Sequence, residues 1–132
     1  MIKPLMSLLA AGLLGGCAIQ PDTPSPLTGR EWVVDTIDDR KALDGSLLSL
    51  TFSADGRVSG SAGCNRFFAQ FQLMNHNTIR IRQAASTMMA CPEALMQQER
   101  RFLDLLEHLN RFRIDPQGNL ILTGEQHSIL AH

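Results

Sequence analysis

The sequence predicts an α+β fold, in which an antiparallel meander of strands is joined to one long α-helix. Two patterns indicate this class. Apolar residues recur at every second position over much of the chain from Trp32 onward, and the period changes to that of a helix after Cys91. The length of 132 residues, with 44% hydrophobic and 19% charged, suits one domain with a modest core.

The clearest strand pair is a hairpin in the first half of the chain. Residues 48–53 alternate apolar and polar, and the Asp55-Gly56 pair that follows favours a tight turn. The returning strand, 57–62, contains Gly60, and a glycine inside a strand often marks a bulge or close packing. Further strands are predicted over 67–73 and 79–82, around a turn at 75–77, and over 112–114, 120–122 and 129–130.

One helix of roughly four to five turns is predicted after Cys91. Pro92 suits the first helical position, and Glu93 suits the positive end of the helix dipole. The residues expected to pack against the sheet are Leu95, Phe102, Leu106 and Leu109, with a partner-binding groove as the alternative. The polar residues Gln98, Glu99, Arg101, Asp104 and Glu107 are expected in solvent, and Asn110, Arg111 and Arg113 suit the C-terminal end.

The first seventeen residues have the pattern of an export signal. Lys3 supplies a positive charge, residues 5–14 are mainly apolar, and Gly15 and Gly16 precede Cys17. The apolar run of about ten residues is about half of what a membrane-spanning helix needs. We therefore expect residues 1–16 to be removed as a signal peptide.

Residues 14–17, Leu-Gly-Gly-Cys, resemble the lipobox of bacterial lipoproteins, in which the cysteine is acylated and becomes the mature N-terminus. The resemblance makes Cys17 the lipidation site and the membrane a partner through this lipid anchor. The alternative is an ordinary signal peptide with Cys17 near the cleavage point. Ala18 stands where an Asp retains enterobacterial lipoproteins in the inner membrane, so the outer membrane is favoured, with the domain facing the periplasm.

A proline-rich tether is expected between the anchor and the domain. Three prolines between residues 18 and 28 fix the backbone and remove amide donors, so residues 17–28 are interpreted as an acylated cysteine and a semi-rigid tether. The folded domain is then expected over 29–132. The net charge of −1 comes from interspersed signs, which predicts no nucleic-acid binding.

Cys64 and Cys91 are the remaining thiols once Cys17 is acylated. An exported protein folds in an oxidising compartment, where two such cysteines are more often bonded than free. A zinc site is one alternative, although no His stands at ligand spacing beside them. A reactive cysteine is another, although no helix start follows Cys64. We predict a disulfide and no metal.

Two separated segments resemble the META domain: residues 58–67, VSGSAGCNRF, and residues 87–92, TMMACP, followed by Glu99 and Phe102 in the predicted helix. The resemblance runs from about residue 29 to the C-terminus and is strongest to the HslJ-type heat-inducible lipoproteins. It implies a curved sheet or partly open barrel packed with one long helix, with the two motif cysteines paired. It also implies a link to envelope stress and to novobiocin tolerance, and a fold likened to lipoproteins that pilot secretins.

Four residues of these motifs are candidates for a binding surface: Asn65, Arg66, Met88 and Met89. Each also has a structural interpretation. Asn65 can bond its own backbone in a turn, and Arg66 can cap carbonyls or meet a carboxylate. The two methionines can fill an irregular gap in the core. Phe68 departs from the smaller polar residue of many family members, which affects any shared surface around Asn65 and Arg66.

The sequence predicts a protein without catalytic activity and without a cofactor. The four histidines are scattered, and no metalloprotease helix, nucleophile elbow or phosphate-binding glycine loop is present in the sequence. The expected function is support of envelope integrity or stress tolerance by a monomer that binds another envelope protein. One alternative is a carrier or pilot that holds an acyl chain or apolar peptide in a barrel cavity. Another is an inhibitor of a periplasmic hydrolase.

Overall fold

The computed structural model describes residues 11–17 and 25–132. The predicted signal peptide and tether therefore lie largely outside the described residues. Within the described part of the chain, no helix is long and apolar enough to cross a membrane. Leu27 is fully buried and Thr28 bridges to Phe52, so packed structure begins two residues before Gly29, where the domain was expected to start.

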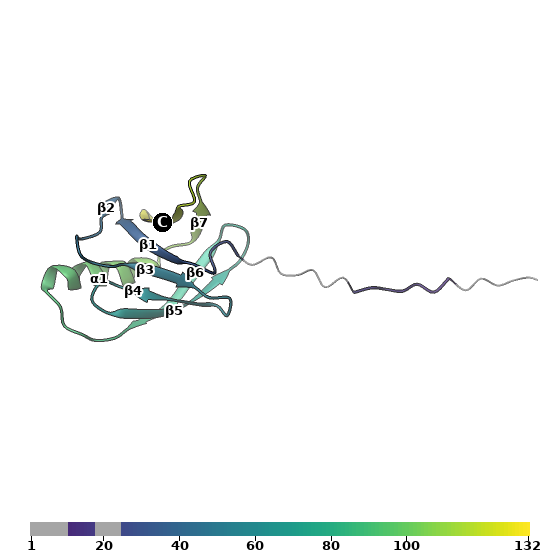
Figure 1. Cartoon of the computed structure of the whole chain (residues 1–132), viewed down its shortest axis with the longest axis horizontal. Helices are drawn as coiled ribbons and strands as arrows, with labels where there is room; N and C mark the ends of the chain where they lie inside the picture. The colour runs from purple at the N-terminus through teal and green to yellow at the C-terminus, as the bar shows by residue number, and fades with distance from the viewer. Residues whose placement is uncertain (1–10, 18–24) are drawn as a thin grey trace, which may run out of the picture.

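Nine strands and one helix follow in the described residues (Figure 1). They are β1 (Glu31–Ile37), β2 (Arg40–Lys41), β3 (Ser49–Phe52), β4 (Arg57–Ser61), β5 (Arg66–Leu73), β6 (Ile79–Ser86), α1 (Glu93–Leu106), β7 (Arg111–Ile114), β8 (Leu120–Gly124) and β9 (His127–Ala131).

Eight of the strands form one curled antiparallel sheet in the order β6-β5-β4-β3-β1-β9-β8-β7, and β2 pairs with β1 alone. The sheet curls until its two ends meet at a single bridge between Thr78 and Arg111. Beside this bridge the Ile79 N–H donates to the Asn110 carbonyl at 3.1 Å. Among the described residues the two ends meet at this point alone, so the fold is a partly open half-barrel with one helix, which confirms the α+β prediction of a curved sheet or partly open barrel.

Strand β1 belongs to both halves of the sheet. Its first residues, 31–33, pair with β3, and residues 34–37 pair with β9. The register shifts between Val34 and Thr36, and such a bulge bends a strand and increases its twist. The bend lets one strand follow the curl, so the two halves share a continuous core.

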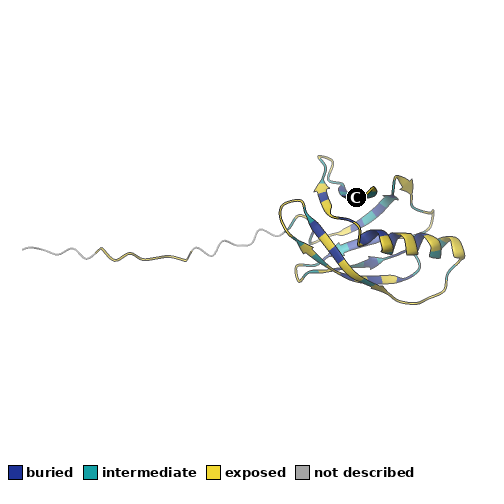
Figure 2. Cartoon of the chain, turned by 180° about the vertical axis from the view of Figure 1, so that it is seen from behind, coloured by how far each residue is buried: buried dark blue, intermediate teal, exposed yellow. Residues whose placement is uncertain are grey.

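The helix packs its apolar side against the concave face of the sheet, where the buried residues gather (Figure 2). Phe102 on α1 meets Phe67 on β5 edge to face, with ring centroids 5.7 Å apart. Large side chains occupy the interior, and those that are almost fully buried include Trp32, Phe52, Phe67, Phe102, Leu50, Ile79, Leu105 and Leu120.

The hairpin around Asp55-Gly56 is confirmed as β3–β4. Gly60 on β4 is a site of close packing, as predicted, because a Cβ there would overlap the Ser49 carbonyl of β3. Strand β6 extends further than predicted, to Ser86. It does so through an irregularity opposite β5, where Gln83 adopts a positive φ of 59°.

The predicted helix differs from the structure at both ends. Pro92 is the N-cap rather than the first helical residue, and α1 ends at Leu106. Arg111 and Arg113 therefore do not follow the helix end but lie in β7. The reason is long-range: the chain must be extended after Leu109 for residues 110–112 to reach the edge of β6.

Candidate functional site

A disulfide joins the two META-like segments. Cys64 follows β4 and Cys91 precedes α1, and their sulfurs are bonded, with Cα atoms 6.0 Å apart. The predicted disulfide is confirmed, which removes the zinc and reactive-thiol alternatives for these two residues. Residues 87–90, between β6 and α1, are consequently held beside the turn at residues 62–65.

Asn65 fastens the same loop through its side-chain amide. Its Oδ1 accepts hydrogen bonds from the Met89 N–H at 2.6 Å and from the Thr87 hydroxyl at 3.0 Å. Its Nδ2 donates to the Met89 carbonyl at 3.3 Å. Asn65 thus bonds a segment more than twenty residues away, rather than its own turn, and its side chain acts as a peptide group would in a strand pair.

Glu99 lies beneath this loop, and the prediction that it is solvated is wrong. It is 4% exposed. Its Oε2 accepts from the backbone N–H of Asn65 at 3.3 Å and from its Nδ2 at 3.2 Å. The other oxygen, Oε1, is buried and accepts no hydrogen bond from any described residue. The sequence held the signal: Glu99 falls four residues after Leu95 and three before Phe102, on the apolar stripe itself.

Gln98 is buried beside it, also against expectation. Its Oε1 accepts from the Leu43 N–H at 2.8 Å, and its Nε2 donates to the Ser46 hydroxyl at 3.0 Å. These bonds tie α1 to the loop before β3. Two neighbouring polar residues of the helix are therefore buried because each satisfies a backbone segment from another part of the fold.

A shallow groove of about 360 Å³ lies between the loop 87–90 and α1. We call it the methionine groove, lined by Asn65, Ser86, Thr87, Met88, Met89, Ala90, Met96, Glu99, Arg100 and Leu103. Met88 is 96% exposed and Met89 is 62% exposed, so they do not fill a core gap. Arg100 at the rim forms an ion pair with Glu93 at 2.9 Å, and its hydrogen bond lowers the pKa of Glu93.

The methionine groove brings together three of the four candidate residues: Asn65, Met88 and Met89. Arg66 is not among the lining residues, and its side chain is exposed. Its backbone instead pairs with Thr87, whose hydroxyl accepts from the Arg66 N–H at 3.2 Å. Met96, Arg100 and Leu103, on the helix, are lining residues that the sequence did not single out, and Glu99 was named in the family motif but not as a member of a binding surface.

Histidine–carboxylate pairs occur where β1 and β9 pair, in the middle of the sheet order. His127 Nδ1 lies 3.1 Å from Asp38, and His132 Nδ1 lies 2.8 Å from Asp35. Asp38 also accepts from the Ser128 N–H at 2.9 Å, so the first pair joins β9 to the turn after β1. Among the described residues, no group of three or more His, Cys, Asp or Glu is placed to hold a metal ion.

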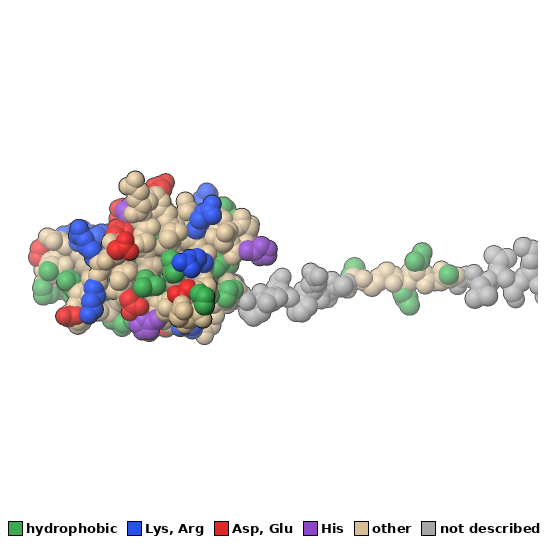
Figure 3. All heavy atoms as spheres, turned by 90° about the horizontal axis from the view of Figure 1, so that it is seen from above, with side chains coloured by type: hydrophobic (Ala, Val, Ile, Leu, Met, Phe, Trp, Pro, Cys, Tyr) green, Lys and Arg blue, Asp and Glu red, His purple; other side chains and the backbone are tan. Residues whose placement is uncertain are grey.

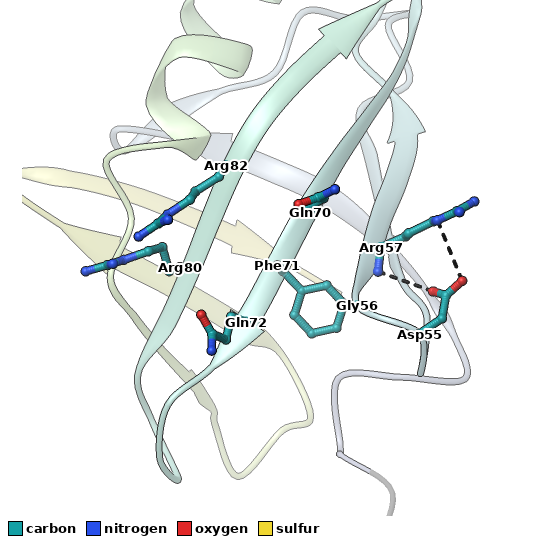
Figure 4. A pocket seen from close by; sticks show the side chains of 8 residues that line it. All are labelled: Asp55, Gly56, Arg57, Gln70, Phe71, Gln72, Arg80 and Arg82. Carbon is teal, nitrogen blue, oxygen red and sulfur yellow. Dashed lines mark hydrogen bonds and ion pairs between the residues drawn. The ribbon is translucent and has the colours of Figure 1, made fainter.

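A second hollow, of about 520 Å³, lies on the outer side of β4, β5 and β6 (Figure 4). It is lined by Asp55, Gly56, Arg57, Gln70, Phe71, Gln72, Arg80 and Arg82. The face of the molecule seen in Figure 3 differs from this hollow, because Lys, Arg, Asp and Glu side chains are interspersed there.

Comparison with known proteins identifies the fold and the family. Residues 25–132 match the META domain family. An NMR structure of a protein from Burkholderia xenovorans is similar, with a TM-score of 0.63 and 22% identity over 92% of this chain and 96% of that one. A second NMR structure matches with a TM-score of 0.62 and 22% identity, over 83% of this chain and 92% of the other. No curated protein matches significantly.

Proposed function

Because the chain belongs to the META domain family, whose members are associated with the cell envelope, we propose that it is a non-enzymatic envelope protein that binds an apolar segment of another envelope protein. The observation that carries the proposal is the methionine groove. Three methionines and Leu103 form an open apolar surface on a base that a disulfide and the Asn65 bonds hold in place.

The chemistry of the groove suits a protein segment. Methionine side chains are flexible and polarisable, so they adapt to apolar partners of different shape. The volume of about 360 Å³ falls at the lower end of the range typical of ligand sites. A short apolar stretch with a few side chains is therefore an appropriate occupant.

The buried carboxylate adds a polar requirement. Oε1 of Glu99 lacks a donor among the described residues, and a buried oxygen without a donor is unfavourable. A bound segment that supplies an N–H or O–H to this oxygen is favoured over a purely apolar one.

The export pattern supports the location that we propose. The proposed signal peptide over residues 1–16 and the proposed acylation of Cys17 rest on the lipobox-like residues 14–17. The proposed insertion in the outer membrane, with the domain facing the periplasm, rests on Ala18. Metabolic labelling with palmitate is expected to mark the chain, and a Cys17→Ala variant is expected to remain unlabelled. Labelling of that variant, or an unlabelled wild type, contradicts the anchor.

Site-specific photocrosslinking in cells tests the binding proposal. A photoreactive residue at position 88 is expected to yield a covalent adduct, and mass spectrometry is expected to map the partner peptide to an apolar segment. A photoreactive residue at exposed position 101 is expected to yield no such adduct. Glu99→Gln replaces an acceptor by a donor and is expected to reduce the adduct strongly. Asp104→Asn, which removes a charge from the exposed side of the same helix, is the matched control and is expected to leave it unchanged. Equal adducts in both variants contradict the proposal.

Growth of cells that lack the protein tests the physiological part. We propose that deletion raises sensitivity to heat and to novobiocin, and that wild type and Asp104→Asn restore tolerance while Glu99→Gln does not. If Glu99→Gln restores tolerance fully, tolerance does not depend on the methionine groove.

Two other functions have a specific observation in their favour. A carrier of a lipid or peptide is favoured by the apolar lining of the groove, and native mass spectrometry of protein from membranes is expected to detect the ligand. A hydrolase inhibitor is favoured by the exposure of Met88 on a loop bounded by a disulfide. For that function the crosslinked peptide comes from the cleft of a periplasmic hydrolase.

A further inference from the structure

The outer side of β4, β5 and β6 carries a group of cations at neighbouring positions of the sheet. Arg57 pairs across the strands with Gln70, and Gln70 pairs with Arg82. Gln72 pairs with Arg80 one step further along. Figure 4 shows Arg80 and Arg82 projecting from the same side of β6. We call these five residues the arginine face.

The arginine face is electrostatically unbalanced. Arg80 and Arg82 form no ion pair with any described residue, and Arg57 has one exposed partner, Asp55, at 3.7 Å. The other two residues of the arginine face, Gln70 and Gln72, are neutral. Since the whole chain has a net charge of −1, attraction to an anion arises only when this side of the domain faces it.

The positive region extends onto the next strand. Thr78, two residues before Arg80, bridges to Arg111 of β7 at the place where the two ends of the sheet meet. Arg111 and Arg113 are both exposed, alternating with buried Phe112. The cations therefore continue around the outside of the half-barrel instead of converging on one point.

The start of β4, the end of β5 and the start of β6 carry the arginine face, and they lie at the end of the domain where the described chain enters at residue 25 (Figure 1). Thr28 bridges to Phe52, just before the Asp55-Gly56 turn, and the Gly56 carbonyl accepts from the Phe71 N–H at 2.9 Å. The entering chain, the β3–β4 turn and the start of the arginine face therefore share one rim. At that rim Met74, just after β5, is 51% exposed.

The length of chain before residue 25 limits how far this rim can lie from an anchored Cys17. Ser25 lies eight positions after Cys17, so even a fully extended chain between them spans at most about 28 Å. A lipid on Cys17 thus keeps the arginine face within a short distance of the headgroups. The tether therefore allows the arginine face to reach the headgroups, where a charged surface attracts basic residues within a Debye length of roughly 10 Å.

We propose that the arginine face docks on the phosphate groups of anionic phospholipids at the surface of the membrane that holds the anchor. The proposal rests on the lipid anchor proposed above. Arg57 and Arg82 are two strand spacings apart, about 10 Å, which suits separate headgroups rather than one small anion. Exposed Met74 beside the cations suits the boundary between headgroups and acyl chains.

Vesicle co-sedimentation tests the docking independently of acylation. The full chain carrying Cys17→Ser is mixed at low ionic strength with phosphatidylcholine vesicles, with or without phosphatidylglycerol. Residues 1–16 are the same in every variant, so only differences between variants are interpreted. Phosphatidylglycerol is expected to increase binding, and Arg80→Gln with Arg82→Gln is expected to reduce that increase roughly tenfold.

The matched control removes two arginines elsewhere. Arg40 on β2 and Arg101 on α1 are exposed, and Arg40→Gln with Arg101→Gln changes the net charge equally. This variant is expected to keep the phosphatidylglycerol-dependent binding. Equal loss in both double variants, or equal binding to both vesicles, overturns the proposal. Because palmitate labelling reports acylation separately, a failure of the anchor is distinguishable from a failure of the docking.

Competition identifies the source of the phosphate. Inorganic pyrophosphate is expected to release the chain from the vesicles no more than sodium chloride of equal ionic strength does. If pyrophosphate releases more protein than sodium chloride of equal ionic strength does, the arginine face binds a soluble anion, and membrane docking is overturned.

Discussion

At the scale of single residues, Asn65 and Glu99 connect three segments of the fold. The Asn65 amide bonds both backbone groups of Met89, and the Glu99 carboxylate accepts from the backbone and the side chain of Asn65. Buried polar groups of this kind are favourable only when their partners are present, so loss of one member leaves the others unsatisfied.

Asn65→Ala is therefore expected to lower the free energy of unfolding by about 2–3 kcal/mol. Glu99 loses a donor and Met89 loses both of its partners. Urea unfolding measures the change, and Asn75→Ala is the control, because Asn75 is exposed and its side chain accepts one bond from Asn77 in a turn. A loss below about 0.5 kcal/mol for Asn65→Ala contradicts the network.

Asp115 gives the turn before β8 a dependence on pH. Its carboxylate accepts from the Asn119 and Gln117 N–H groups, and the bond from Asn119 is the main cause of its lowered pKa. A pKa that is lower in the folded state than in the unfolded state stabilises the fold above the unfolded value, and this stabilisation is lost as pH falls through the folded value.

The difference in urea midpoint between wild type and Asp115→Ala is therefore expected to be largest near neutral pH and to shrink in acid. The control is Asp44→Ala, which removes an exposed carboxylate from another turn. A difference that is constant with pH shows that the ionised carboxylate does not stabilise the turn.

The sequence predicted the residues of the site better than their roles. The disulfide between Cys64 and Cys91 was predicted, and Asn65, Met88 and Met89 were named as candidates for one surface, which the methionine groove brings together. The partners of Asn65 could not be predicted, because they lie more than twenty residues away. Burial of Glu99 was hidden by its charge, although its spacing on the helix indicated it.

At the scale of elements, local patterns were sufficient for the β3–β4 hairpin and for the existence of α1. The end of α1 was predicted too late because Leu109 continues the apolar spacing but is buried from a loop. Strand β1 was not delimited, because it pairs with β3 on one side and with the far C-terminal β9 on the other. Such pairings are set by the whole fold rather than by local sequence.

Gly60 sets how closely β3 and β4 approach. A Cβ at this position overlaps the Ser49 carbonyl, so Gly60→Ala must displace one strand. We expect a loss of about 3 kcal/mol in the free energy of unfolding. Ser59→Ala, one residue earlier in the same strand, is expected to change stability by less than about 0.5 kcal/mol. Equal effects of the two variants mean that the strands can separate freely.

The disulfide joins the turn between β4 and β5 to the residues just before α1, and its two cysteines are 27 positions apart in the sequence. Replacing both cysteines by serine is expected to lower the free energy of unfolding by about 3–4 kcal/mol, because the unfolded chain gains freedom. Amide exchange of residues 87–90 is expected to accelerate in the same variant. An unchanged exchange rate means that the Asn65 bonds alone hold the loop.

At the scale of the whole molecule, the half-barrel depends on a single strand. β1 joins the two halves of the sheet, and the far edges meet at one bridge between Thr78 and Arg111. The interior side chains come from both halves and from α1, and they form one continuous cluster. Neither half therefore has a core of its own, and separate stability of the halves is not expected.

Unfolding is accordingly expected to be one cooperative transition. Trp32 is the sole tryptophan, it is 1% exposed on β1, and its indole N–H donates to the Leu27 carbonyl at 3.0 Å. Its fluorescence reports the strand that both halves share, whereas far-ultraviolet circular dichroism reports all strands and the helix. The two midpoints in urea are expected to coincide. Loss of ellipticity before the change in Trp32 fluorescence contradicts this, because β7–β9 or α1 must then separate while β1 stays packed against β3.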